Sequence, residues 1–240
     1  MRLFRLLLLF TFCALPSLFA AACAPALLSV YDTSGFTCQV NAYTVKDFVY
    51  SQISGTILIP DTAITVTPVF GVNTLGLQFS SNQFTVSGTD TAKYLLAYTW
   101  DPGDIRGFTD FLDTDPPVFP GLAKISTDLC EDAAFIGPLC SMTTANVTVS
   151  DNGVTLIHSA SVAFSPSIGT VGVRNTIELD GNGASAVFTS FTNDLVVPEP
   201  ATSIGCLLAL GLLGLRLRRR DPVTREACSQ RPSPPSFVTQ

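Results

Sequence analysis

Five aspartates close together are the residues whose types and spacing come closest to a chemical site. They are Asp101, Asp104, Asp110, Asp113 and Asp115, in a stretch rich in proline and glycine. Calcium takes about six to eight oxygen ligands from carboxylates and carbonyls, so the stretch is a candidate calcium site. Its spacing fits no known calcium-binding loop, and nothing places two carboxylates across a cleft as a glycosidase requires. Calcium binding is therefore left open.

The single histidine limits the hydrolytic chemistry that the chain could perform. A Ser-His-Asp triad would have to use His158, and no Gly-x-Ser-x-Gly elbow is present. His158 falls within a run of alternating residues, so we expect it to be half-buried in mid-strand. Aromatic platforms for a sugar are not evident beyond Tyr98 and Trp100. The sequence thus predicts a protein that is not an enzyme and uses no cofactor.

The cysteines predict disulfides rather than a metal site. Seven are present, and four of them fall in the part that we expect to be exported: Cys23, Cys38, Cys130 and Cys140. Three connectivities are possible, and we favour Cys130–Cys140, which closes a short loop, with Cys23–Cys38 following by elimination. There is no Cys-x-x-Cys pair, and one histidine cannot complete a usual zinc site, so no metal is predicted.

The elements that must position these residues are strands. From about Val30 to Val196, short runs rich in Val, Thr, Ile and Phe are separated by Gly, Pro, Asn and Asp. Residues 154–164 follow a period of two, directly after the hairpin signal Asp151-Asn152-Gly153. Roughly eight to eleven such strands predict an all-β fold, an antiparallel β-sandwich of jelly-roll or immunoglobulin-like type over residues 23–197. Asp101–Pro120 is its expected long loop.

The first 22 residues have the pattern of a secretory signal peptide. Arg2 and Arg5 precede an apolar run at 6–15, and small residues follow at 20–22. We therefore predict a signal helix that the export machinery and a signal peptidase recognise. Lipidation of Cys23 is left open, because Ala20 stands where lipoprotein signals usually carry leucine.

The charge of the exported part excludes one class of partner. Between Cys23 and Pro200 there are 17 acidic and five basic residues, a net charge near −12. Such a surface is repelled by phosphate backbones, so no nucleic-acid partner is expected.

The C-terminal region combines a short motif, an apolar span and a cationic end. Pro198-Glu199-Pro200 precedes residues 201–217, which would form a helix of about 25 Å, near the lower limit for crossing a membrane. Its glycines disfavour a soluble helix. Arginines then mark the cytoplasmic end: Arg216, Arg218, Arg219 and Arg220.

This arrangement at 198–220 resembles the PEP-CTERM sorting domain of exported bacterial proteins. The resemblance implies recognition by an exosortase, a membrane enzyme that cuts near the motif. It implies that Pro198, Glu199 and Pro200 are the sorting motif, and that the arginine cluster is a retention signal. Such proteins often accompany exopolysaccharide production. Residues 221–240 extend further than usual in this family and are expected to be a disordered tail, either a true extension or a mis-called stop codon.

Together these features predict an exported surface or extracellular-matrix protein. We expect the C-terminal helix to anchor it in the membrane before processing, after which it is at the cell surface or secreted. Exosortase, signal peptidase, the membrane and exopolysaccharide are its expected partners. The alternatives are an anchored carbohydrate- or calcium-binding β-sandwich module and, less favoured, a hydrolase.

Overall fold

The computed structural model describes residues 21–114 and 120–198. The chain divides into two compact units, Met1–Pro198 and Glu199–Gln240, and every described residue belongs to the first. The expected signal helix, the apolar span at 201–217, the arginine cluster and the 221–240 tail therefore lie outside the described residues. Within the described residues, no helix is both long and apolar enough to cross a membrane.

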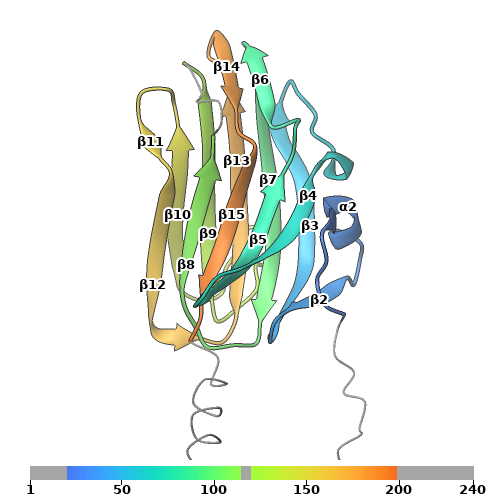
Figure 1. Ribbon diagram of the computed structural model, residues 1–240, viewed down its shortest axis with the longest axis vertical. Coiled ribbons are helices and arrows are strands. Elements are labelled where there is room, and N and C mark those ends of the chain that lie inside the picture. Colours follow the sequence, from blue (N-terminus) through green and yellow to red (C-terminus); the bar gives the residue numbers. More distant parts are fainter. Residues whose placement is uncertain (1–20, 115–119, 199–240) are drawn as a thin grey trace, which may run out of the picture. The chain divides into compact units, whose positions relative to one another are not determined.

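Two antiparallel sheets lie over one another with their strands along the long axis (Figure 1). The larger sheet has seven strands in the order β11-β10-β9-β13-β7-β3-β2. In chain order these are β2 (Thr37–Val40), β3 (Tyr43–Gly55), β7 (Thr91–Asp101), β9 (Leu122–Glu131), β10 (Thr144–Asp151), β11 (Leu156–Ile157) and β13 (Val171–Asp180).

The second sheet has six strands in the order β1-β4-β5-β15-β8-β12. They are β1 (Ala26–Leu27), β4 (Thr65–Phe70), β5 (Thr74–Ser80), β8 (Ile105–Asp113), β12 (Ser159–Ile168) and β15 (Ser190–Val196). A separate pair, β6 (Thr85–Gly88) and β14 (Ala184–Val187), and the short helices α2 (Leu28–Tyr31) and η2 (Asp61–Ala63) complete the described elements. The antiparallel β-sandwich is thus confirmed, while its jelly-roll or immunoglobulin-like type stays a prediction.

Alternating side chains build the core between the sheets. In β7, Tyr94, Leu96, Tyr98 and Trp100 are buried, whereas Lys93, Leu95 and Ala97, which alternate with them, are only partly buried. This is the period of two that a strand with one solvated face requires. Aromatic side chains dominate the packing: Phe79 of β5 and Phe191 of β15 stack at 5.0 Å, and aromatic residues of both sheets meet in the same core.

The predicted long loop Asp101–Pro120 is wrong over most of its length, because residues 105–113 form β8. Ile105, Phe108, Asp110 and Leu112 of this strand are buried, and β8 pairs with both β12 and β15. The prolines of this stretch flank the strand and do not interrupt it. Their density misled the prediction, since proline is tolerated at strand boundaries.

The expected burial of His158 is also wrong. His158 is exposed and lies between β11 and β12, at a break in the run that the sequence predicts as one strand. The preceding turn, however, is confirmed: β10 and β11 form a hairpin around Asp151-Asn152-Gly153, with Gly153 at a φ of 74°. The Asn152 side chain accepts hydrogen bonds from two backbone N–H groups of this turn.

Candidate functional site

The aspartates of the acidic stretch do not form one site. Asp104 precedes β8 and Asp113 ends it, so the length of a nine-residue strand, roughly 30 Å, lies between them. Asp110 lies in the buried core, and Asp115 is outside the described residues. No group of three or more His, Cys, Asp or Glu side chains arranged to hold a metal occurs among the residues that the structure describes.

The two aspartates at the start of this stretch are held by cations and hydroxyls. The Lys46 ammonium on β3 lies 2.7 Å from Asp101 Oδ2, and the Thr170 hydroxyl donates to Asp101 Oδ1 at 2.8 Å. These bonds lower the pKa of Asp101. A hydrogen bond from Ser167, with Arg106 nearby, likewise lowers the pKa of Asp104. Both carboxylates therefore serve to join strand ends.

A closed ring of four polar side chains lies in the centre of the core. Asp110 of β8 and Asn193 of β15 face Thr127 of β9 and Asn175 of β13 across the sandwich, and each is at most 1% exposed. Contacts run from Asp110 to Thr127, from Thr127 to Asn175 at 2.7 Å, from Asn175 to Asn193 at 2.9 Å, and from Asn193 back to Asp110. The Tyr98 hydroxyl also donates to Asn193 Oδ1 at 2.7 Å.

The number of hydrogen-bond donors in this ring favours a protonated carboxyl group on Asp110. Each asparagine directs one N–H along the ring and Thr127 contributes one O–H, so three donors serve four contacts. If the side-chain amides of Asn175 and Asn193 are both turned by 180°, which exchanges their oxygen and nitrogen, there are still three donors for four contacts. The fourth contact is a hydrogen bond only when Asp110 carries a proton. Burial independently raises the pKa of Asp110 to about 7, which favours the same protonated form.

The outer face of the seven-stranded sheet carries most of the basic residues that the structure describes. Lys93 of β7 and Lys124 of β9 lie 3.9 Å and 3.8 Å from the Glu178 carboxylate of β13, which stands between them in register. Every lysine and arginine of the described residues has a carboxylate within 4.0 Å. The remaining acidic residues therefore leave the surface negative.

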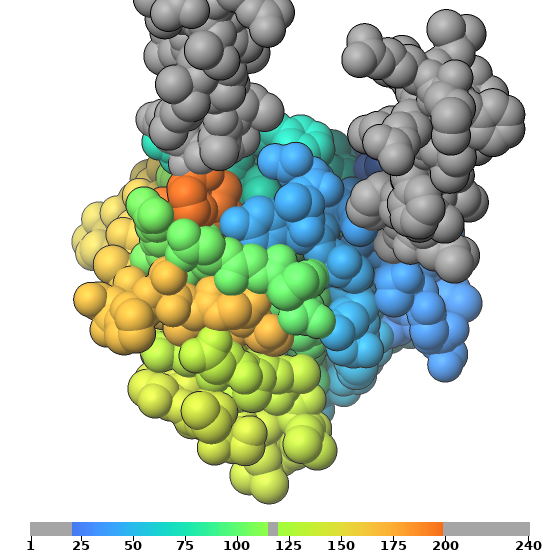
Figure 2. Space-filling view, turned by 90° about the horizontal axis from the view of Figure 1, so that it is seen from below, coloured from blue at the N-terminus to red at the C-terminus, as the bar shows by residue number. Residues whose placement is uncertain are grey.

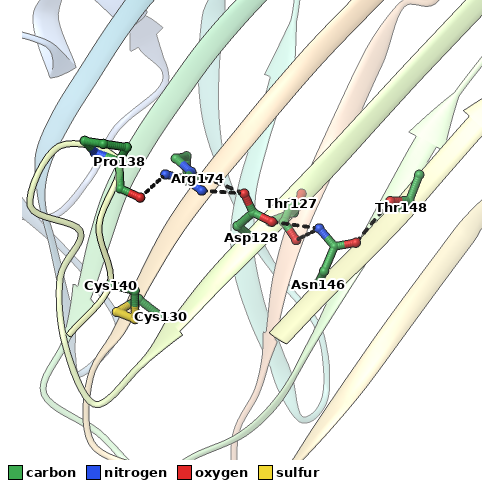
Figure 3. Close-up of polar contacts among 8 residues, drawn as sticks. All are labelled: Thr127, Asp128, Cys130, Pro138, Cys140, Asn146, Thr148 and Arg174. Carbon is green, nitrogen blue, oxygen red and sulfur yellow. Dashed lines mark hydrogen bonds and ion pairs between the residues drawn. A yellow bond between two sulfur atoms is a disulfide. The ribbon is translucent and has the colours of Figure 1, made fainter. Parts of the chain in front are cut away.

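Arg174 is the centre of a second cross-strand row on this face (Figure 3). Its guanidinium donates to Asp128 Oδ2 at 2.7 Å and to the Pro138 carbonyl at 2.6 Å, and it lies 4.5 Å from the ring centre of Phe135. Asp128 in turn accepts a hydrogen bond from Asn146 at 2.9 Å. Arg174 and Asp128 together thus link β13, β9 and β10 to the loop between β9 and β10.

That loop is closed at its base by the Cys130–Cys140 disulfide, which confirms the favoured pairing (Figure 3). Ile136 and Leu139 exchange backbone hydrogen bonds around Gly137, whose φ is 58°. These two side chains are 75% and 70% exposed, so the loop presents an apolar tip on a rigid base. In Figure 2 the yellow-green segment that contains it projects from the domain.

The second disulfide, Cys23–Cys38, also agrees with the predicted connectivity. Cys38 belongs to β2, and the Cys23 N–H donates to the Gln39 carbonyl at 2.8 Å. The bond uses the sulfur that lipidation would modify, so the disulfide and a lipid on Cys23 exclude each other.

The two aromatic residues considered as sugar platforms belong to the core. Trp100 is 0% and Tyr98 is 2% exposed, and their rings contact each other at 6.3 Å. Neither can stack on a sugar, so a carbohydrate surface on this domain would have to use other residues.

Comparison with protein families identifies the end of the chain. The profile of the PEP-CTERM protein-sorting motif matches residues 196–220. The chain carries a PEP-CTERM sorting motif. This motif implies sorting by an exosortase and a place at the cell envelope. A comparison with curated proteins finds no match.

Several solved structures are similar to the domain at low TM-scores. The module TmCBM61, in complex with β-1,4-galactotriose, is similar over 61% of this chain and 86% of that chain, with 10% identity and a TM-score of 0.32. A family 11 carbohydrate-binding module from Clostridium thermocellum covers 69% and 92%, with 10% identity and a TM-score of 0.29. The enzymatically active domain of tailspike protein 4 from bacteriophage CBA120 covers 61% and 18%, with 12% identity and a TM-score of 0.28. Scores this low carry no argument about ligand or activity.

The PEP-CTERM match begins inside the folded domain. Val196 is the last residue of β15, and the Val197 N–H donates to the Asn73 carbonyl at 2.9 Å. Pro198 follows directly and is half-buried, while Glu199, Pro200 and the arginine cluster lie outside the described residues. Proline has no N–H to donate, so the ladder of β15 ends where the Pro-Glu-Pro residues begin.

Sequence reasoning missed the polar ring and the Arg174 cluster. A weak signal for the ring exists: in β13, Asn175 occupies an inward position between Val173 and Ile177. A polar residue at an apolar position of the period is a buried group that needs partners. For Arg174 the chain offers no comparable signal, because its partners come from separate segments.

Proposed function

We propose that this chain is an exported surface or extracellular-matrix protein, processed by an exosortase and associated with exopolysaccharide or biofilm. The observation that carries the proposal is the PEP-CTERM match at residues 196–220, which starts at the last residue of the final strand of a folded domain. A sorting tail at the end of a compact domain suits a protein that is delivered folded to the outer surface and then released or attached there.

Export into an oxidising compartment is supported by the two disulfides. Both join residues of the part that we expect to leave the cell, and such bonds persist mainly outside the cytosol. In this scheme a signal peptidase removes residues 1–22. The span at 201–217 then holds the precursor in the membrane with the arginines on the cytoplasmic side.

The domain acts in this proposal through its surface and not as an enzyme. The polar groups that sequence analysis considered for chemistry are used to hold the fold: Asp101 joins strand ends, and Asp110 closes the buried ring. The chain's one histidine lies exposed between two strands. Its acidic surface and small covalently closed loops suit an extracellular protein that must stay soluble and folded.

Cell fractionation tests the proposal. The full chain is expressed in a host that has an exosortase and in the same host lacking that gene. We expect a shortened form at the surface or in the medium of the first host, and the uncut precursor in the membrane of the second. A matched variant with glutamine at Arg216, Arg218, Arg219 and Arg220 should lose its membrane orientation in both. Identical fractionation with and without the exosortase would contradict the proposal.

A further inference from the structure

The strand that leads into the sorting motif is not free to enter an enzyme. β15 lies inside its sheet and pairs with β5 on one side and β8 on the other, and both pairings continue to Val196, opposite Thr74 and Gly107. The last of these contacts is followed at once by the bond from the Val197 N–H to Asn73. The backbone is thus engaged up to the residue before Pro198.

Side chains hold the same segment in place. Leu195 is 0% and Val197 is 9% exposed, and both belong to the core cluster. Figure 1 shows β15 running to the edge of the described domain, where the chain continues into the tail. There is consequently no spacer between the last packed residue, Val197, and the first residue of the motif, Pro198.

A processing enzyme needs an extended substrate whose backbone groups are available. Proteins that capture extended segments commonly do so by forming backbone hydrogen bonds with them. In β15 these groups are already paired on both edges. To place the bond after Val196 in an active site, the end of β15 would have to leave two neighbouring strands and expose Leu195 and Val197 to water, which is a local unfolding event.

We infer that the folded domain sets the N-terminal limit of processing, so that the scissile peptide bond lies on the carboxyl side of Val197. In this step the carbonyl carbon of the scissile amide is attacked by water or by an amine of an acceptor. The C–N bond breaks, and the leaving nitrogen takes a proton and departs with the tail. The mature protein therefore keeps β15 complete, with its new carboxyl end at Val197 or later.

This inference rests on the proposed exosortase processing, and trypsin gives a direct measurement. Arg174 and Arg216 are consecutive tryptic sites, with no lysine or arginine between them. The C-terminal tryptic peptide of the mature protein therefore starts at Asn175, and its mass gives the last residue. We expect an end at Val197 or beyond. An end at Val196 or earlier would overturn the inference.

A peptide Asn175–Arg216 from all of the protein would instead mean that no processing occurs, which contradicts the proposed function. The protected boundary is then measured on this uncut full chain with elastase, which cuts after small aliphatic residues such as Val196 and Ala201. We expect cleavage after Ala201 and none after Val196 in the folded protein, and cleavage at both in urea. Equal cleavage at both sites without urea would overturn the inference.

Discussion

The Thr127 hydroxyl on β9 contacts the Asp110 carboxyl on β8, and this contact joins the two sheets in the middle of the core. Neither side chain is more than 1% exposed. No lysine or arginine shares the contact; the other partner of the carboxyl is the Asn193 amide. The carboxyl group is therefore stabilised by hydrogen bonds and burial in its neutral form, and it loses that stabilisation when it ionises.

Replacing Asp110 with asparagine should change how stability depends on pH. The folded-state pKa of Asp110, about 7, lies above its unfolded value, so the folded protein holds a proton that the unfolded chain has released. Its contribution is fully present below pH 4 and is lost as the pH rises toward 7, by up to about 4 kcal/mol. Asparagine supplies the fourth donor permanently. We expect Asp110→Asn to match the parent near pH 4 and to be more stable at pH 8.

Urea unfolding, followed by the fluorescence of the single buried Trp100, measures this difference. The pKa of Asp194 is also raised by burial, to about 6, but that residue is unchanged in both proteins and cancels in the comparison. Asp113→Asn, at the exposed end of the same strand, is the matched control and should follow the parent. If the free energy of unfolding depends on pH in the same way in the parent and in Asp110→Asn, Asp110 is not the proton-binding group of the ring.

The sequence predicts the strands well but not the ring, for a physical reason. Local patterning shows that Asn175 and Asn193 occupy inward positions of strands, because side chains alternate with a period of two. Which inward residues meet depends on sheet order and register, and Asp110 and Asn193 are 83 residues apart. Contacts between residues so far apart in the sequence are set by the long-range pairing of strands and not by neighbouring residues.

Arg174 should be more important for the loop than for the rest of the fold. Lysine at this position keeps the charge but lacks the planar fork that reaches Asp128 and Pro138 together. Because the pair is partly exposed, we expect Arg174→Lys to cost only about 1 kcal/mol of unfolding free energy. Hydrogen exchange at Ile136 and Leu139 should nevertheless rise clearly. Lys93→Arg, on the same face, is the control. Unchanged hydrogen exchange at Ile136 and Leu139 in Arg174→Lys would show that Arg174 does not hold the loop.

Removing the Cys130–Cys140 disulfide should loosen the same loop and destabilise the domain. With a sequence separation of 10, its closure is worth on the order of 3 kcal/mol. Replacing both cysteines with alanine should lower the unfolding free energy by about that amount and make residues 131–143 sensitive to proteases. Equal stability of the parent and the double variant would refute this, as would free thiols at both positions in non-reducing peptide maps of the exported parent.

Added calcium should leave the thermal midpoint unchanged. The described aspartates of the acidic stretch are spread from the end of β7 to the end of β8, and two of them, Asp101 and Asp104, already have cationic partners. A ligand at 100 times its dissociation constant would stabilise the fold by about 2.7 kcal/mol, an effect that is easy to detect. Differential scanning calorimetry at 5 mM calcium measures it, since this concentration is several times the weakest dissociation constant of extracellular sites, about 1 mM. The same concentration of magnesium is the control. A thermal midpoint that rises with calcium but not with magnesium would show that the domain has a calcium site and would contradict this prediction.

The acidic stretch also shows where composition misleads. Prolines and aspartates in residues 101–120 indicate a loop when counted together. The apolar residues at 105, 108 and 112 form the buried side of β8, and they are decisive because burying them between two sheets outweighs local turn preference. The cysteine pairing, in contrast, could be predicted, since closing the shorter loop is the simpler connection.

The central claim is that the Pro-Glu-Pro residues mark this chain for processing, and the intact mass of the protein tests it most directly. In a host with an exosortase, the parent should be found at the mass of a shortened form. Alanine at Pro198, Glu199 and Pro200 should leave membrane insertion intact but keep the precursor uncut, as in the host without the enzyme. If the alanine variant is shortened and released like the parent, the tail is a plain membrane anchor and the account is contradicted.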